Sequence, residues 1–487
     1  MSGMVMVAEA FATLVLVPLA AACLVLVLPG RVRWVAIAAG LLPMVPAMVL
    51  LTEELLHAGP VRLAVGGFDA PLGIVWHLDE LSAVMLWLNV TLALLVGLHA
   101  AVRYRVSDQS GQRFWLLWLL LAGSMNALLL SADLFNLFVT LELVTLAAIG
   151  LLVVDRKPAA LRAAVRYLLL ALLGSLFYLL GVALIYGKAG TLDLYQIGSV
   201  LELDVLSRTA LVLMTIGLLI KAAIFPLHGW LPAAHGNAPG PVSAVLSAMV
   251  VKVAIYLVWR LWLWMGVGWD LPVAMFLLGL MGAGAIVYGS LLAFVQQRLK
   301  MVIAYSTVAQ LGYLMLLFPL LGAVAFQAAS YHLLSHGVAK AAMFLAAANL
   351  LARAGSDRLA DLGGADRRQP LDVFTLAIAG ISILGLPPSG GFIAKWLLLQ
   401  TSLEQGAWLW MAVILGGGLL AAAYLFRVLS TLCARPVTCP EPAPVRDADH
   451  VAGLAGLALA LAAFIAGLVP APILAFLANA WPPGSLQ

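Results

Sequence analysis

The strongest constraint on the fold is a series of apolar stretches that recurs along the whole chain. Each stretch is about 20 residues long, the length that an α-helix needs to cross a hydrocarbon core of about 30 Å. Of the 487 residues, 64% are hydrophobic and only 10% are charged, whereas a soluble domain has roughly 25% charged residues. The sequence therefore predicts an all-α, polytopic membrane protein.

We predict about fourteen membrane spans from these stretches. They cover residues 10–28, 34–51, 80–102, 114–131, 134–154, 163–187, 207–227, 240–264, 271–294, 300–321, 323–352, 372–402, 407–432 and 452–480. The polar connections between them are too short to fold as separate domains. No Lys or Arg precedes the first span, which carries Glu9, so we expect a retained helix and not a signal peptide.

The 26 Lys and Arg residues are unevenly distributed between the two sides of the predicted bundle. Most of them, Lys300 included, lie in connections that follow odd-numbered spans, whereas the opposite side holds only Arg62, Lys188, Arg208 and Arg260. Because short cytoplasmic loops carry the excess of basic residues, the odd connections are predicted in the cytoplasm and both termini outside. We expect a multi-pass protein of a bacterial inner (cell) membrane. The net charge of +4 then reflects topology and not nucleic-acid binding.

Ionisable residues also occur inside the apolar spans, namely Glu142, Lys221, Lys252, Lys340 and Lys395. Each costs at least about 2.5–3.5 kcal/mol in the middle of a bilayer. A structural interpretation is that the lysines extend to the interface or that a Glu–Lys pair joins two helices. A functional interpretation is proton transfer, because burial lowers the pKa of a lysine and a nearby carboxylate restores it. Five such residues together favour the functional interpretation.

The segment YHLLSHGVAKAAMF places His332, His336 and Lys340 at steps of four residues. Such steps put all three side chains along one stripe of a helix. Histidine titrates near neutral pH, so the stripe is typical of a proton relay. A zinc pair is the alternative, but no third ligand is evident and a lysine one turn away would repel the metal.

The other histidines carry weaker signals. His228 and His235 lie near the predicted cytoplasmic end of the seventh span, where they are candidates for proton uptake or simply line a wet loop. The remaining four are expected at the surface or the membrane interface: His57, His77, His99 and His450.

Proline and glycine interrupt two of the predicted spans. Pro226 follows Lys221 by a few residues, and Pro387 and Pro388 precede Lys395 in ISILGLPPSGGFIAKW. Proline removes a backbone hydrogen bond, and in lipid the freed carbonyl needs a neighbouring group or water. Paired breaks are typical of transporters with internal repeats, so spans four to eight should match spans nine to thirteen. The order of Lys and Pro differs between the two breaks.

No cofactor or metal site is predicted. Cys23, Cys433 and Cys439 form no CxxC pair, so they indicate neither an iron–sulfur cluster nor a disulfide framework. The segment GVALIYGKAG differs from a phosphate-binding loop by one extra residue between its glycines and by Ala189 in place of Ser or Thr. We therefore expect no redox centre in this chain and no ATP-driven pumping by it.

Five segments, in this order, are similar to one known family: NLFVTLELVTL, IKAAIFPLHGWLP, APGPVSAVLSAMVVKVAIYLVWR, YHLLSHGVAKAAMFL and GLPPSGGFIAKW. They resemble the antiporter-like subunits of Mrp-type cation/proton antiporters, respiratory complex I and membrane-bound hydrogenases. The resemblance implies fourteen helices with two inverted five-helix repeats and breaks in helices 7 and 12. The implied divisions are residues 1–112 (helices 1–3), 113–265 (first repeat), 266–432 (second repeat) and 433–487 (helix 14).

The resemblance also implies a role for each buried charge. Glu142 would pair with Lys221 and Lys252 would come next, followed by the stripe His332, His336 and Lys340, with Lys395 as the terminal residue of the relay. Opening of the Glu142–Lys221 pair would make Lys221 a better proton donor to the next site. The family commonly has an acidic residue after WLP, where this chain has Ala233; His235 would partly replace it.

The resemblance implies partners as well: other membrane subunits, protons and Na⁺. The sequence ends just after the fourteenth span, and Lys395 stands where complex I subunit M has Glu, which together favour a chain like the D-type Mrp subunit or complex I subunit N. We expect a proton-translocating subunit of an Mrp-type Na⁺/H⁺ antiporter. The alternatives are a proton-pumping subunit of a complex I-like or hydrogenase complex, a stand-alone solute carrier, and a membrane transferase with His332 or His336 as base.

Overall fold

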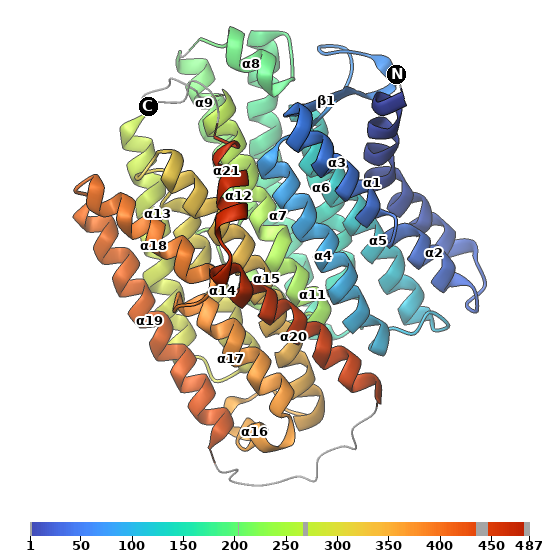
Figure 1. Ribbon diagram of the computed structural model, residues 1–487, viewed down its shortest axis with the longest axis vertical. Helices are drawn as coiled ribbons and strands as arrows, with labels where there is room; N and C mark the ends of the chain where they lie inside the picture. The colour runs from blue at the N-terminus through green and yellow to red at the C-terminus, as the bar shows by residue number, and fades with distance from the viewer. Residues whose placement is uncertain (1, 203, 266–270, 435–446, 482–487) are drawn as a thin grey trace.

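The structure, a computed structural model, describes residues 2–202, 204–265, 271–434 and 447–481. Cys439 lies outside the described residues. The chain is mostly helical, and helices run side by side along the long axis of the molecule (Figure 1). One small antiparallel sheet pairs β1 (Val61–Ala64) with β2 (Val75–Leu78) at one end of the helices. The all-α fold predicted from the sequence is confirmed.

In the described part of the chain, eleven spans are long and apolar enough to cross a membrane, by length and composition. They are formed by α1 (Ser2–Val27), α2 with α3 (Arg33–Leu41, Met44–Ala58), α4 (Glu80–Arg103), α5 (Gln109–Leu130), α6 (Leu134–Leu152), α7 (Pro158–Ala189), α11 with α12 (Gly240–Val245, Val251–Arg260), α13 (Pro272–Val295), α15 (Ala323–Ala354), α19 (Trp408–Cys433) and α20 (Asp447–Leu468).

The three other predicted spans are shorter or broken helices. Residues 300–321 form α14 (Leu299–Met315). Residues 207–227 form α9 (Val205–Lys221), and the helix resumes after Pro226 as α10 (Leu231–Asn237). Residues 372–402 form α17 (Pro370–Leu384) and α18 (Gly390–Glu404), with Pro387 and Pro388 between them. Both breaks therefore occur where the prolines predict them.

A recurring hydrogen-bond motif relates the two halves of the chain. Asp133, just before α6, forms an isolated antiparallel bridge with Asp193, and Arg298, just before α14, forms the same bridge with Arg358. Arg298 follows Asp133 by the same number of residues by which Arg358 follows Asp193. The segment between the bridged residues includes α7 in the first half and α15 in the second, each 32 residues long.

The two bridges lie at opposite ends of the molecule. α8 (Leu194–Val200), directly after the first bridge, is at the top of Figure 1, whereas α16 (Ala365–Arg368), shortly after the second, is at the bottom. The same motif thus appears upside down in the second half, which is the arrangement expected of inverted repeats.

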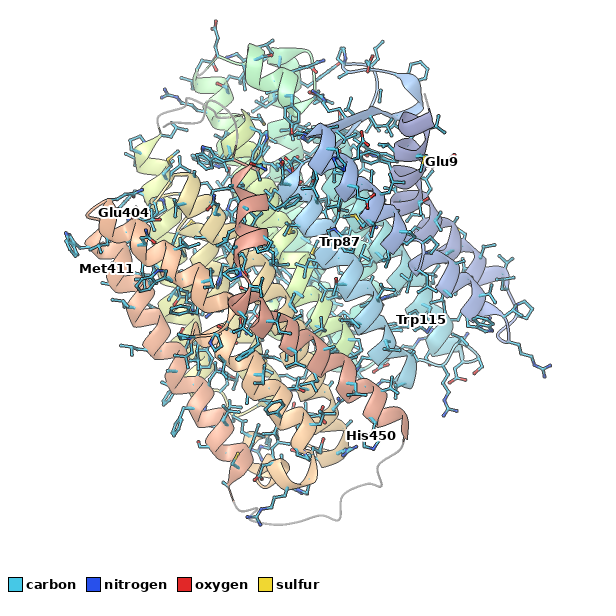
Figure 2. The ribbon with its side chains drawn as sticks, viewed as in Figure 1. Glu9, Trp87, Trp115, Glu404, Met411 and His450 are labelled. Atoms are coloured by element: carbon cyan, nitrogen blue, oxygen red, sulfur yellow. The ribbon has the colours of Figure 1, made fainter. Side chains whose placement is uncertain are left out.

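The ends of the described chain lie on one side. α1 begins and α21 (Ala471–Ala478) ends toward the top of Figure 1. Figure 2 shows Glu9 near that end and His450, at the start of α20, near the opposite end. An even number of crossings gives this arrangement, so the predicted placement of both termini on one side fits the fold.

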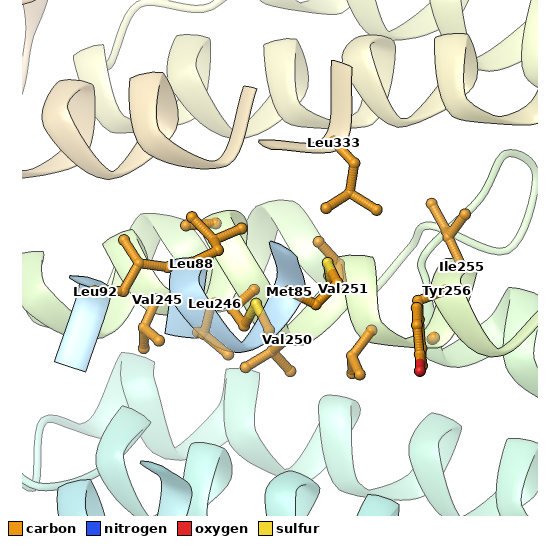
Figure 3. Close-up of a cluster of buried hydrophobic side chains, with 14 of the residues drawn as sticks. Met85, Leu88, Leu92, Val245, Leu246, Val250, Val251, Ile255, Tyr256 and Leu333 are labelled. Atoms are coloured by element: carbon orange, nitrogen blue, oxygen red, sulfur yellow. The ribbon is translucent and has the colours of Figure 1, made fainter. Parts of the chain in front are cut away.

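The span formed by α11 and α12 is the centre of the molecule. Its central part is wholly buried by other helices, and π-helical turns flank α12 at Leu246–Val250 and Leu261–Met265. Figure 3 shows apolar side chains of this span packed against α4 and α15. No residue of this span needs to face lipid, so any charged group on α12 is enclosed by protein.

Glycines bring α7 and α9 into backbone contact. A Cβ added to Gly217 would lie 2.3 Å from the carbonyl oxygen of Gly174, and one added to Gly174 would lie 2.7 Å from that of Gly217. Small residues are the usual means of close helix packing in membranes. Ser175 follows Gly174 directly and Lys221 lies one turn after Gly217, so this contact positions both side chains.

We predict that Gly217→Ala destabilises the protein by about 1–3 kcal/mol, because the added methyl group overpacks the α7–α9 contact. Gly187→Ala is the matched control, since a Cβ at Gly187 meets nothing within 4 Å. Thermal unfolding of the detergent-solubilised protein measures both effects. Equal melting temperatures for the two variants would contradict the packing argument.

Candidate functional site

The first buried charge pair joins α6 to α9. Nζ of Lys221 donates to Oε1 of Glu142 at 2.5 Å and to Oγ1 of Thr145 at 3.2 Å. Glu142 also accepts a hydrogen bond from Ser175 of α7. The Lys221 side chain is 5% exposed and that of Glu142 is 19% exposed. The predicted pair is therefore present in the geometry, with the lysine enclosed and the carboxylate nearer the surface of the chain.

Lys252 is held in the centre of the molecule with no carboxylate partner among the residues that the structure describes. Its Nζ donates to the carbonyl oxygen of Ser247 at 2.7 Å, within the π-helical turn that precedes α12. Such turns leave the regular helical hydrogen-bond pattern and occur frequently at functional sites. Oγ of Ser247 in turn hydrogen-bonds Oγ1 of Thr307 on α14 at 2.8 Å. Lys252 is thereby linked to α14.

Lys340 reaches the same helix from α15. Its Nζ donates to Oγ of Ser306 and, at 3.1 Å, to the carbonyl oxygen of Ile303. Ser306 is next to Thr307 in the sequence. Thr307 is hydrogen-bonded to Ser247, the residue to which Lys252 donates. Two consecutive hydroxyl residues of α14 therefore connect the two lysines, and the Ser247–Thr307 contact joins the first half of the chain to the second.

The histidine stripe on α15 forms as the spacing predicts. The rings of His332 and His336 lie 5.5 Å apart and nearly parallel, at 10°. All four ring nitrogens are buried and have no hydrogen-bond partner within the described residues. Buried polar atoms of this kind normally bind water or a mobile neighbour. No group of three or more His, Cys, Asp or Glu residues in the described part could hold a metal ion.

Lys395, on α18, hydrogen-bonds across the second helix break to the end of α17. Its Nζ donates to the carbonyl oxygens of Ile383 at 2.8 Å and Leu384 at 3.1 Å, at the end of α17. It also lies 4.5 Å from the centre of the Tyr313 ring. The C-terminal carbonyls of a helix carry partial negative charge, which favours an ammonium group there.

The counterpart of Lys395 in the first repeat is Trp230, not Lys221. Nε1 of Trp230 donates at 2.9 Å to the carbonyl oxygen of Ile220, at the end of α9. Trp230 precedes Lys395 by the same number of residues by which Asp133 precedes Arg298. This explains why Lys precedes Pro in one break and follows it in the other. The two lysines come from opposite sides of their breaks.

The two histidines near the seventh span differ in their surroundings. His228 lies in the break and packs against the rings of Phe225 and Tyr288. His235 lies on α10, is fully buried, and stacks on Phe344 at 4.9 Å. His235 is also within electrostatic reach of three lysines, namely Lys300, Lys340 and Lys252. Of these two histidines, only His235 is thus placed next to the buried lysines Lys252 and Lys340.

A polar cavity of about 600 Å³ opens on the predicted cytoplasmic side. Among the residues that line it are Arg103, Asp155, Lys157, Arg298, Lys300, Asp357 and Arg358. Its two carboxylates are in ion pairs, Asp155 with Arg103 and Asp357 with Arg298. Lys300, which also lines the cavity, donates to the carbonyl oxygen of Ala238, one turn after His235. The cavity therefore approaches His235 from the water.

The prediction that Lys300 belongs to a polar connection is wrong, because its side chain is buried at the start of α14. His77 and His99, predicted at the surface or the membrane interface, are likewise buried within the protein. His99 is hydrogen-bonded to Oδ1 of Asn349 on α15 at 3.0 Å. Lys300 and His99 each bond to a residue that is far away in the sequence, so the sequence does not reveal these contacts. The one available signal for the burial of Lys300 is the segment LKMVIAY, in which it is the single lysine among apolar residues.

A second buried ion pair, between Asp79 and Arg260, is not evident from the sequence. The prediction that Arg260 lies in an aqueous connection is wrong, because it is enclosed at the end of α12, where its Nη2 donates to Oδ1 of Asp79 at 2.5 Å. Burial opposes ionisation of Asp79, but the Arg260 guanidinium and the His77 imidazole hold the pKa of this carboxyl well below its usual range. Burial lowers the pKa of His77, although Asp79 raises it in part. A DxxS capping box at Asp79 and Ser82 was the available sequence signal.

Asp79→Asn should destabilise the protein by about 3–5 kcal/mol, because it leaves Arg260 buried without its counter-ion. A carboxyl with a lowered pKa contributes its stability above its ordinary pKa, so the loss should be complete at neutral pH and shrink in strong acid. Asp204→Asn is the matched control: Asp204 forms the same capping box with Ser207, but its ion pair with Lys188 is exposed. Melting curves at pH 7 that shift equally for both variants would contradict this account.

The comparisons with known proteins agree with this architecture. Residues 131–421 match the family described as "NADH:quinone oxidoreductase/Mrp antiporter, TM". NADH-quinone oxidoreductase subunit N of Desulforudis audaxviator is 35% identical over 416 residues, covering 84% of this chain and 82% of the relative. The D-type subunit of the Na(+)/H(+) antiporter of Bacillus subtilis is 27% identical over 390 residues, covering 78% and 77%.

Solved structures give the same result. A chain of the Mrp complex from Dietzia sp. DQ12-45-1b is 26% identical, with a TM-score of 0.87 and 97% of each chain covered. A chain of the archaeal membrane-bound sulfane sulfur reductase is also 26% identical, with a TM-score of 0.84 and 96% of each chain covered.

The chain belongs to the NADH:quinone oxidoreductase/Mrp antiporter transmembrane family. It is an antiporter-like, proton-translocating membrane subunit of the kind found in multi-subunit Mrp and complex I-like assemblies.

Proposed function

We propose that this chain moves protons along the buried row from Glu142 to Lys395 as a subunit of an Mrp-type Na⁺/H⁺ antiporter. The observation that carries the proposal is the enclosed Glu142–Lys221 ion pair at one end of a row of buried lysines and histidines. We further propose a bacterial cell membrane with both termini outside, and repeats at residues 113–265 and 266–432.

Within the described residues, the lysines of the row have one negatively charged partner, Glu142. Of the ion pairs in the described part of the chain, only the one with Glu142 involves a residue of the row. A proton on Lys221 is favoured while the carboxylate is close. When the pair opens, the ammonium loses this stabilisation, and Lys221 becomes a better donor toward Lys252. Because charges inside a protein interact more strongly than in water, the next proton in the row is repelled onward.

The middle of the row offers alternating donors and acceptors. Lys252 and Lys340 share α14 through Ser247, Thr307 and Ser306. His332 and His336 present ring nitrogens that have no partner in the described structure, so water can hydrogen-bond to them. Lys395 then holds the proton at the second helix break.

Proton uptake is proposed through the cavity above Lys300. The cavity is polar and reaches Ala238, whose carbonyl oxygen is bonded to Lys300. His235 lies one turn earlier on the same short helix, so it is the proposed first acceptor inside the protein. Ala233 supplies no carboxylate at this point, which leaves His235 as the titratable group of α10.

Glu142→Ala and Lys221→Ala should each abolish proton-coupled transport while the complex still assembles, because each removes one half of the switch. Proton flux in inverted membrane vesicles measures transport, and a native gel measures assembly. Glu404→Ala and Lys188→Ala are controls of the same residue types near the ends of spans, where little change is expected. Normal transport by both test variants would remove the relay.

The kind of complex is a separate question, and two observations favour different answers. The TM-score of 0.87 to an Mrp complex chain supports the antiporter. The 35% identity to an NADH-quinone oxidoreductase subunit N supports a redox-driven complex as the second candidate, in which other chains would carry the redox centres.

Purification of the native complex from its own membranes decides between these candidates. For the antiporter we expect only other membrane subunits to co-elute with this chain, as identified by mass spectrometry, and Na⁺ to drive proton movement in vesicles. Co-elution of soluble subunits with cysteine clusters would contradict the antiporter and establish the redox-driven alternative.

A further inference from the structure

The proposed row contains a gap between His332 and Lys395, and an aromatic ring occupies it. The ring of Tyr313, on α14, lies 5.5 Å from the ring of His332 and 4.5 Å from Nζ of Lys395, measured between ring centres and from ring centre to nitrogen. Tyr313 is fully buried. The Tyr313 ring therefore contacts both residues of the proposed row.

The surrounding helices hold the ring firmly in place. At Gly312, the preceding residue, α14 touches α13 so closely that an added Cβ would lie 2.3 Å from the carbonyl oxygen of Gly282. The hydroxyl of Tyr313 donates to the carbonyl oxygen of Ile414 on α19 at 3.3 Å. Gly417 leaves room for this hydroxyl, because a Cβ there would approach it to 2.4 Å. The hydroxyl is thus engaged with α19, while the ring face is directed at Lys395.

The two repeats stabilise their lysines differently. Lys221 has a carboxylate at 2.5 Å, whereas Lys395 has two backbone carbonyls and the Tyr313 ring. An aromatic face attracts a cation through its quadrupole, and the attraction is stronger where water is excluded. It is nevertheless weaker than a full negative charge nearby. A lysine held in this way can bind a proton and still release it.

We propose that Tyr313 is a positioning residue for Lys395, whose ring replaces a carboxylate and sets the pH at which Lys395 passes its proton on. This inference rests on the proposed relay. In each cycle the amine of Lys395 binds one proton and later gives it up to water, so only an N–H bond forms and breaks. Removal of the ring makes the protonated form less favourable, and Lys395 then carries a proton only at lower pH.

The test is the pH profile of proton flux through the native complex reconstituted in vesicles. Tyr313→Leu removes the ring and should move the alkaline limb of the profile by about one pH unit toward acid, with activity recovered at lower pH. Tyr313→Phe keeps the ring and should retain the wild-type limb. Tyr305→Leu makes the same change two turns earlier on α14, near Tyr288 of α13, and should leave the limb in place.

Each outcome has a definite reading. A wild-type limb in assembled Tyr313→Leu overturns the proposal, as does a Tyr313→Phe shift equal to that of Tyr313→Leu, because the hydroxyl would then be responsible. If Tyr313→Leu does not assemble, Gly417→Ala is the second test, because its added methyl group displaces the ring from the α19 side. This variant should shift the alkaline limb of the pH profile toward acid, and an unchanged alkaline limb overturns the proposal. Lys395→Ala tests the relay separately: normal flux in that variant removes the relay whatever the Tyr313 variants show.

Discussion

A helix that is interrupted inside a membrane exposes backbone carbonyls that lipid cannot hydrogen-bond, and much of this structure follows from that constraint. At the first break, the carbonyl of Ile220 is bonded by the indole of Trp230. At the second, the carbonyls of Ile383 and Leu384 are bonded by Lys395. The carbonyls at the two helix ends thus receive hydrogen bonds from a neutral donor, Trp230, at the first break and from an ionisable donor, Lys395, at the second. The second repeat therefore acquires a titratable group at a place where the first has only a structural contact.

The four lysines of the proposed row have different sets of partners, so the row is a sequence of unequal sites. Lys221 has a carboxylate, Lys252 a carbonyl in a π-helical turn, Lys340 a hydroxyl with a carbonyl, and Lys395 carbonyls with an aromatic face. A full counter-ion binds an ammonium most strongly in a medium of low dielectric constant. In the proposed relay, proton affinity is thus set by local partners, and opening of the Glu142 pair would change it most.

Asp79 and Arg260 form a contrasting ion pair. Both side chains are enclosed, and the guanidinium also packs over the rings of Tyr256 and Trp264. A bidentate pair with aromatic neighbours is rigid, and it joins the start of α4 to the end of α12. The protein therefore contains one ion pair with a partly exposed carboxylate, Glu142, which the proposed relay would open, and one that holds the central span in register.

The sequence by itself determined the spans, both helix breaks and the five charges inside the apolar spans, from Glu142 to Lys395, because hydrophobic length, proline chemistry and the cost of a charge in lipid are properties of short segments. It also placed His332, His336 and Lys340 on one stripe, since helix periodicity is local. Only the tertiary structure decided which partners these residues have. Lys300 and His99 are buried, Arg260 pairs with Asp79, and Lys395 matches Trp230, because each of these relations joins segments that are distant in the chain and meet only when the helices pack.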